Sequence, residues 1–343
     1  MKRKLVSVMT RYLADNPITL QTHTGDVRAL AVLDGRIASV DDGHLIVQVP
    51  NTEDCGMGSE LDSDLNFQDS PSITKINFPE KSHPQCLSFS TSGSYVGVLD
   101  YTGKLSVFNA HSGAVSTTYQ VGTHGTAVAL FSFASHGKDS GENWISVHHD
   151  RVMTIQRGIV SELCSQPGIV GARYFPDRQE LCFVDKQTSV TTYSFAGEAP
   201  TRKGESIRLS ETDVLGSASF SPKGDAVAGI AEYGKFGAVY DLNSAGTKQH
   251  TFNSPRPTAR REDTSLLACS FSENGRQLWV SSEGGEIEVY DSGRGTKIGA
   301  IETETAQYEG DQPTPAAMML TSPDGQLLFG CGNSVMATRL VPF

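Results

Sequence analysis

The sequence lacks any long apolar stretch. Its apolar residues come in runs of about 4 to 8, well short of the roughly 18 that a membrane-spanning helix needs. It also lacks an excess of positive charge, because 28 Lys and Arg stand against 39 Asp and Glu and the net charge is −11. A free-standing nucleic-acid binder and a protein held to anionic lipid by bulk charge both need a positive field. We therefore expect no transmembrane segment and no direct nucleic-acid partner.

Cysteine is scarce and dispersed, and no two cysteines form a C-x-x-C pair. This spacing argues against a zinc ribbon and against a thioredoxin-type site. Four of the six lie in apolar strand-like runs, where a free cysteine packs as a small hydrophobe. We expect inert thiols in a reducing compartment, cytoplasmic or nuclear. The six are Cys55, Cys86, Cys164, Cys182, Cys269 and Cys331.

The first residues, 1–4, are basic, but they do not introduce a secretory signal. The apolar stretch Leu5–Leu13 is interrupted by Ser7, Thr10 and Arg11, and no small-residue cleavage pattern follows it. A mitochondrial presequence, which is also basic and poor in acids, is the alternative for this segment.

Catalytic motifs are missing as well. The run His148-His149-Asp150 has metal-ligating atoms, but adjacent residues of a strand point to opposite faces of the sheet. Glycine-rich pieces such as Gly293–Gly295 are not followed by the Lys-Ser/Thr or the helix of a phosphate loop. No Gly-x-Ser-x-Gly elbow occurs. We therefore expect no enzyme, no cofactor and no metal site.

What the sequence does contain is a repeated unit. Each copy has an apolar strand, a polar turn that usually ends in Gly, a second apolar strand, a further turn and a third alternating strand. Copies follow one another at about 40 to 58 residues, close to the roughly 45 of a four-stranded propeller blade. The seven copies begin with Leu30–Gly35, Leu87–Gly93, Leu130–Gly137, Ala172–Arg178, Ala218–Gly224, Cys269–Gly275 and Met319–Gly325.

The turns in these copies have a physical reason to reverse the chain. Pro222-Lys-Gly224 and Pro323-Asp-Gly325 place Pro where φ is near −65° and Gly where φ must be positive. Tight reversals between apolar strands predict hairpins. The sequence thus predicts an all-β protein that forms one domain over residues 1–343.

These repeats resemble those of the WD-repeat β-propellers over essentially the whole chain. In that family a His near the start of each blade hydrogen-bonds towards an Asp in a strand turn, and a Trp-Asp pair closes the third strand. His23 lies at that point, and His83 and His124 fall at comparable ones. The closing pair occurs here as Tyr240-Asp241 and Tyr290-Asp291.

The resemblance implies a closed seven-bladed β-propeller. Its last copy ends after three strands, so the outermost strand of the last blade must come from elsewhere. The resemblance implies that residues 4–13 dock there and pair an otherwise open edge. The alternative is a loose N-terminal arm.

Two acidic segments interrupt the period, over residues 51–70 and 302–315. The first carries six carboxylates with Leu61, Leu65 and Phe67 among them, and the second contains Tyr308. Each is either a solvated loop or, for the first in particular, a docking segment that orders against a basic partner. The opposite charge gathers at Arg256, Arg260 and Arg261, which form either a clamp for phosphate or acidic peptide or a solvated loop.

The function that we predict is a non-catalytic scaffold subunit that binds other proteins within a larger complex. One alternative is a phosphoinositide-binding propeller of the autophagy type, because Ala259–Glu262 lies near where the Phe-Arg-Arg-Gly motif of those proteins would be. Membrane lipid is the partner in that case. A second alternative is a propeller enzyme or ligand binder.

Overall fold

The chain is an all-β protein. The computed structural model describes residues 12–14, 18–34, 36–49, 72–77, 83–122, 125–134, 142–197, 199–244, 246–253, 265–282, 286–302, 319–321, 327–331, 334–338 and 340–342. Within these ranges the only helical element is a single 3-10 turn, η2 (Pro176–Arg178). No helix that could cross a membrane occurs in the described part of the chain.

The strands form six four-stranded antiparallel sheets, one five-stranded sheet and one two-stranded pair. In most sheets the strands follow one another in chain order, so each sheet is a meander. The first three sheets contain β3 (Ala29–Leu33), β4 (Arg36–Val40), β5 (His44–Val49) and β6 (Ser72–Asn77); β7 (Pro84–Phe89), β8 (Tyr95–Asp100), β9 (Lys104–Asn109) and β10 (Val115–Gln120); and β11 (Ala127–Phe133), β12 (Asn143–His148), β13 (Arg151–Gln156) and β14 (Ile159–Ser165).

The five-stranded sheet comes next. It contains β15 (Ile169–Phe175), β16 (Glu180–Asp185) and β17 (Ser189–Ser194), and both β18 (Thr201–Arg202) and β19 (Ile207–Arg208) pair with β17. Two regular meanders follow, with β20 (Leu215–Phe220), β21 (Ala226–Ala231), β22 (Phe236–Asp241) and β23 (Thr247–Asn253), and then β24 (Leu266–Phe271), β25 (Gln277–Ser282), β26 (Glu286–Asp291) and β27 (Thr296–Glu302).

The last sheet takes strands from both ends of the chain. Its order is β2-β30-β29-β28, with β28 (Met319–Thr321), β29 (Leu327–Cys331), β30 (Ser334–Thr338) and, at the edge, β2 (Ile18–Thr22). The edge strand is therefore not the predicted segment 4–13, of which residues 4–11 lie outside the described residues. Tyr12–Ala14 forms β1, which pairs with β31 (Leu340–Pro342). The physical reason is the length of the connection. In the first three meanders a short loop joins the outer strand of one sheet to the first strand of the next sheet, and a loop of the same kind joins β2 to β3.

The hairpin between the first and second strands recurs with the same chemistry. Ser90, Ser221 and Ser272 each stand three residues before a turn glycine, and each hydroxyl accepts the backbone amide of the first residue of the second strand, at 2.9–3.1 Å. The turn glycines have φ of +67° to +71°, a region that only glycine enters without strain. The Ser-x-x-Gly pattern thus sets where the chain reverses.

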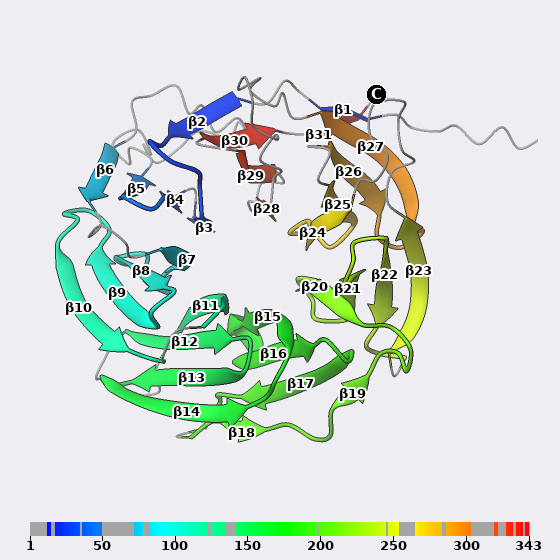
Figure 1. Cartoon of the computed structure of the whole chain (residues 1–343), viewed down its shortest axis with the longest axis horizontal. Helices are drawn as coiled ribbons and strands as arrows, with labels where there is room; N and C mark the ends of the chain where they lie inside the picture. The colour runs from blue at the N-terminus through cyan, green and yellow to red at the C-terminus, as the bar shows by residue number, and fades with distance from the viewer. Residues whose placement is uncertain are drawn as a thin grey trace, which may run out of the picture.

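The hydrophobic core lies between sheets. Five clusters of buried side chains each join two sheets that follow one another in the chain, as when Val184 of β16 packs in one cluster with Leu215 of β20 and Tyr240 of β22. The first strands of successive sheets contact one another, and β28 also contacts β3. Figure 1 shows the sheets set around a common centre with these first strands nearest to it. Burial of both faces of these sheets supplies the main stabilising term.

Backbone hydrogen bonds repeat from sheet to sheet at one end of the strands. In each of these sheets a residue of the turn between the second and third strands makes two such bonds. Its amide donates to the loop that precedes the first strand of the same sheet, and its carbonyl accepts from the loop that precedes the first strand of the next sheet. Tyr101 donates to His83 O (3.0 Å) and accepts from Gly125 N (3.2 Å). His149 donates to Thr126 O and accepts from Ile169 N, and Lys186 donates to Gly168 O and accepts from Leu215 N. In the following sheet two residues of the turn divide these bonds: Glu232 donates to Val214 O, and Gly234 accepts from Leu266 N.

We call these turns and connections the rim. It consists of residues 23–28, 41–43, 83, 101–103, 125–126, 149–150, 168–169, 186–188, 214–215, 232–234 and 265–266.

Close packing between sheets is tested at Gly97 in β8. A Cβ there would lie 2.7 Å from Cζ3 of Trp144, a fully buried ring of the neighbouring sheet. We expect Gly97→Ala to lower the free energy of unfolding by about 1–3 kcal/mol, because the indole cannot retreat into a filled core. Gly122→Ala is the control, since its Cβ would meet His148 only at 3.6 Å. Equal denaturant midpoints for the two variants would contradict the packing described here.

Candidate functional site

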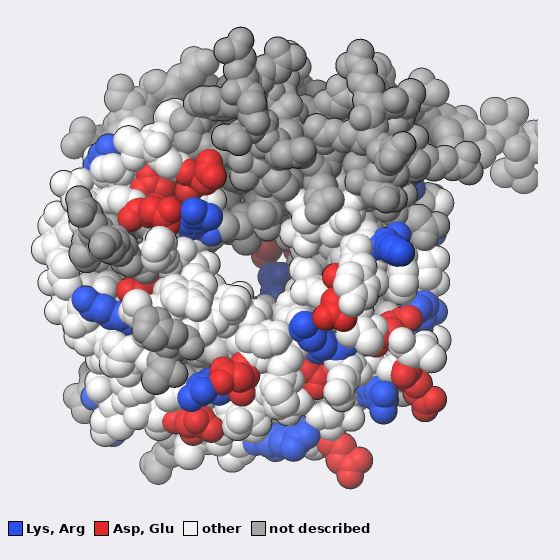
Figure 2. Space-filling model, in the orientation of Figure 1, with Lys and Arg blue, Asp and Glu red and all other residues white. Residues whose placement is uncertain are grey.

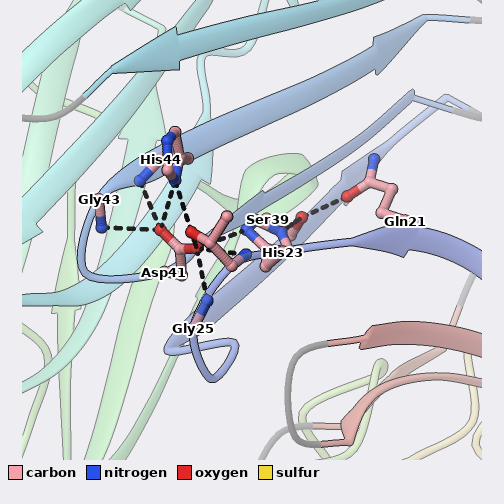
Figure 3. Close-up of polar contacts among 8 residues, drawn as sticks. Gln21, His23, Gly25, Ser39, Asp41, Gly43 and His44 are labelled. Atoms are coloured by element: carbon pink, nitrogen blue, oxygen red, sulfur yellow. Dashed lines mark hydrogen bonds and ion pairs between the residues drawn. The ribbon is translucent and has the colours of Figure 1, made fainter.

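The densest polar cluster of the rim surrounds Asp41, in the turn between β4 and β5. Its Oδ1 accepts the amides of Gly43 (2.7 Å) and His44 (2.5 Å). Its Oδ2 accepts the amides of Thr24 and Gly25, each at 3.1 Å, together with the Thr24 hydroxyl. Figure 3 shows this carboxylate between the two segments. Asp41 thus ties the connection that leads into β3 to the turn that follows β4.

His23 extends the cluster into the protein. Its Nε2 lies 2.6 Å from Ser39 Oγ, and the Ser39 hydroxyl donates to Gln21 Oε1. The Gln21 amide in turn donates to Gln48 Oε1 at 3.2 Å. The other ring nitrogen of His23, Nδ1, is 3.4 Å from Asp41 Oδ2. This is an electrostatic contact, because the geometry of the two groups does not meet that of a hydrogen bond. The chain of side chains runs from β2 through β4 to β5.

Burial and hydrogen bonding set the charges in the cluster. Burial alone would raise the pKa of Asp41, but the amides of Gly43, Gly25 and His44 and the Thr24 hydroxyl outweigh it and hold the pKa well below its usual range. Burial lowers the pKa of His23, and the neighbouring Asp41 carboxylate only partly offsets this. At neutral pH the cluster therefore holds one carboxylate and a neutral imidazole. The carboxylate already accepts five hydrogen bonds, so its lone pairs hold the two backbone segments together and are not available for a base.

An Asp at the end of the second strand recurs in other sheets. Asp100 Oδ1 accepts the amides of Thr102 (2.8 Å) and Lys104 (3.0 Å). Asp185 Oδ1 accepts the amide of Ser189 at 2.9 Å. Asp41, Asp100 and Asp185 were not among the residues predicted from the sequence. The signal that would have found them is an Asp directly after an apolar second strand in three of the seven copies.

The two Tyr-Asp pairs of the third strands have a different place. Tyr240 is buried and donates its hydroxyl to Asp213 Oδ2 (2.8 Å), which also contacts Lys248 Nζ at 2.6 Å. The Tyr290 hydroxyl likewise donates to Glu288, at 2.6 Å.

The aspartates of the two pairs, Asp241 and Asp291, bond to the turn that follows their strand. Asp241 Oδ1 accepts the amide of Asn243, and Asp291 Oδ1 accepts the amide of Arg294.

The remaining predicted residues are not brought together with this cluster. His83 is exposed, and its ring lies 3.6 Å from Asp42 rather than in a buried network. His124 lies outside the described residues. So do all seven candidate partner-binding residues, namely Leu61, Leu65, Phe67, Arg256, Arg260, Arg261 and Tyr308.

Other reactive side chains are engaged in the structure. His148 is buried and contacts Ser146 Oγ, whereas His149 contacts Ile169 O. Burial raises the pKa of the Cys86 and Cys269 thiols to about 12, so neither is a thiolate at neutral pH. Among the described residues no three His, Cys, Asp or Glu side chains are grouped so that they could hold a metal ion.

The rim also carries exposed apolar side chains. Tyr233 is 77% exposed and Val214 is 45% exposed, and the amide of Glu232 donates to Val214 O at 3.0 Å, which places the two beside each other. Tyr101, 44% exposed, occupies the corresponding turn of another sheet. Figure 2 shows carboxylates gathered over the β3–β5 region and acidic and basic groups side by side over β20–β22.

Comparison of the sequence with models of known protein families finds no match, and neither does comparison with curated proteins.

The fastening role of Asp41 predicts a large effect of Asp41→Asn. The amide would place a donor against backbone donors, so we expect a loss of about 2–4 kcal/mol in the free energy of unfolding at pH 7. The folded-state pKa of Asp41 is lowered, so its contribution is fully present above the unfolded value near 4 and is lost as pH falls below it. The difference between wild type and variant, measured by urea unfolding, should therefore shrink between pH 5 and pH 3.

Asp42→Asn is the matched control. Asp42 is the next residue in the chain, but among the described residues its half-exposed carboxylate pairs only with Arg28 and His83. A change of less than about 1 kcal/mol is expected there. Equal effects of the two substitutions, or a difference for Asp41→Asn that stays constant with pH, would contradict the assignment.

Proposed function

We propose that the chain is a seven-bladed β-propeller of the WD-repeat type whose ring is closed by an N-terminal strand. Support comes from the succession of first-strand contacts, in which the last sheet contacts the first through β28 and β3. Leu20 of β2 also packs with Leu30 and Ile37 of the first sheet and with Val335 of the last. A strand from one end of the chain thus pairs with the other end, which is how a ring of sheets protects its seam.

On this architecture we propose a non-catalytic scaffold subunit that binds other proteins through the rim. The observation that carries the proposal is the contrast between engaged polar groups and an exposed apolar pair. Asp41 and His23 serve the fold, whereas Tyr233 and Val214 stand exposed on turns whose backbone is fixed by hydrogen bonds. Exposed tyrosine on a rigid support is typical of the anchors of protein interfaces, because little side-chain entropy is lost on binding.

Affinity purification of the tagged chain, followed by cross-linking and mass spectrometry, identifies the partner and the surface that it covers. We expect cross-links from Lys186, which pairs with Glu232 next to Tyr233, and from Lys235, two residues after Tyr233. The double variant Tyr233→Ala, Val214→Ser should then weaken binding of the purified partner by about 2 kcal/mol or more, measured by calorimetry, as loss of an interface anchor does.

Val115→Ser is the control, since Val115 is 60% exposed but lies on the outer strand β10, away from the rim. Wild-type affinity in the rim variant, together with cross-links that avoid the rim, would contradict the proposal.

A further inference from the structure

A pocket of about 500 Å³ opens between the sheet β11–β14 and the sheet β15–β19. It lies at the ends of the strands opposite to the rim, where β11 ends and where β13 turns into β14. None of the residues discussed above for the rim takes part in it. Its volume is in the range of pockets that bind small ligands and single side chains of a partner.

The floor of the pocket is aromatic. Phe133 and Phe195 come from the two different sheets, and their rings meet edge to face with centroids 5.0 Å apart. Both are buried within the protein. Ile159 and Pro200 form the outer part of the walls, and Ile159 is 70% exposed. An apolar group that enters the pocket would be enclosed on several sides.

One buried donor in the wall has no partner among the described residues. Asn143 is only 1% exposed, and its Oδ1 accepts the backbone amide of Arg157 at 3.2 Å. This bond fixes the orientation of the side-chain amide, since the acceptor side is engaged. The Nδ2 group is buried and makes no hydrogen bond to any residue that the structure describes. Unpaired buried donors are costly and rare in folded proteins, so an acceptor supplied by a bound group would satisfy it.

A cation stands beside this donor. Arg157 is exposed, makes no ion pair with any described residue, and is held at φ +52°, a left-handed conformation that side-chain-bearing residues seldom adopt. None of the described residues that line the pocket carries a carboxylate, in a chain with 39 of them. Among the described residues, the pocket therefore combines an aromatic floor with two kinds of donor and no carboxylate.

We propose that this pocket binds the C-terminus of a peptide that ends in an apolar residue. The terminal side chain would lie on Phe133 and Phe195, and the terminal carboxylate would accept from Asn143 Nδ2 and pair with Arg157. A bare phosphate or a sugar would leave the aromatic floor uncovered. The inference is independent of the proposed function at the rim, because it concerns the other end of the strands.

The test uses the full chain and two fluorescein-labelled hexapeptides of sequence Gly-Ser-Gly-Ser-Ala-Leu. One ends in a free carboxylate and the other in an amide. We expect the free acid to bind about tenfold more tightly than the amide, the effect of one charge-assisted hydrogen bond. The acid should also shift the Asn143 side-chain amide resonance in a nitrogen-15 correlation spectrum.

Two variants separate the roles of charge and floor. Arg157→Asn suits the left-handed backbone and removes the charge, so it should reduce the affinity for the acid to that for the amide. Ile159→Ser should weaken both peptides alike. Arg294→Asn is the matched control, because Arg294 is an exposed arginine in the corresponding turn between β26 and β27.

Equal affinity for acid and amide, an unchanged affinity in Arg157→Asn, or no binding at millimolar peptide would overturn the proposal. A third peptide, with an internal aspartate and an amidated end, distinguishes the source of the carboxylate. If it binds as tightly as the free acid, the pocket reads an internal acidic segment and the assignment to a C-terminus is wrong.

Discussion

Apolar packing and scattered side-chain hydrogen bonds, such as Thr74 Oγ1 to His111 O, hold neighbouring sheets of this protein together. At the rim, backbone hydrogen bonds cross repeatedly from sheet to sheet. A first strand has a ladder partner on one side only, so nothing in the ladders sets how far one sheet is displaced along its neighbour. The peptide groups of Tyr101, His149 and Lys186 supply this constraint, since each donates within its own sheet and accepts from the next. Directional bonds of this kind fix the stagger of the sheets, whereas apolar contacts are tolerant of sliding.

The other polar features follow from this arrangement. A turn that uses its backbone groups for neighbouring sheets needs another source of bonds for the amides left over. Asp41, Asp100 and Asp185 provide them from the end of the second strand. The rim is therefore rigid for reasons that lie in its backbone and in buried carboxylates. Its exposed side chains, Tyr233 and Val214 among them, are left available for contacts with other molecules.

The fold class could be predicted from the sequence because it depends on local chemistry. The reversals at Gly93, Gly224 and Gly275 need a positive φ, and the alternation between them needs strands, so β8 and β26 begin at the residues expected. The prediction for the edge strand of the last sheet was wrong because the length of an apolar run does not decide which segment pairs with β30: the run 4–13 is longer, but Ile18–Thr22 forms the edge. The loop length that leads into β3 was the better guide.

The candidate site was predictable only in part. His23 was singled out, but its partners Ser39 and Asp41 are 16 and 18 residues further along, and no local pattern states which turn the ring faces. The pocket was not foreseen at all. Phe133 and Phe195 belong to different sheets, and Asn143 becomes an unpaired donor only once those sheets are packed. Properties of this kind depend on the spacing between sheets, which periodicity does not encode.

Hydrogen–deuterium exchange at the rim tests the central claim most directly. If the turns bond across sheets, the amides that donate to a turn of the preceding sheet should exchange as slowly as amides within the strands, because they open only when sheets separate. These are the amides of Gly125, Ile169, Leu215 and Leu266. Amides of turns at the other end of the strands, such as Arg157-Gly158, serve as the reference. Those that bond only within their own hairpin should exchange faster. Fast exchange at all four rim amides, with the strands still protected, would contradict the account.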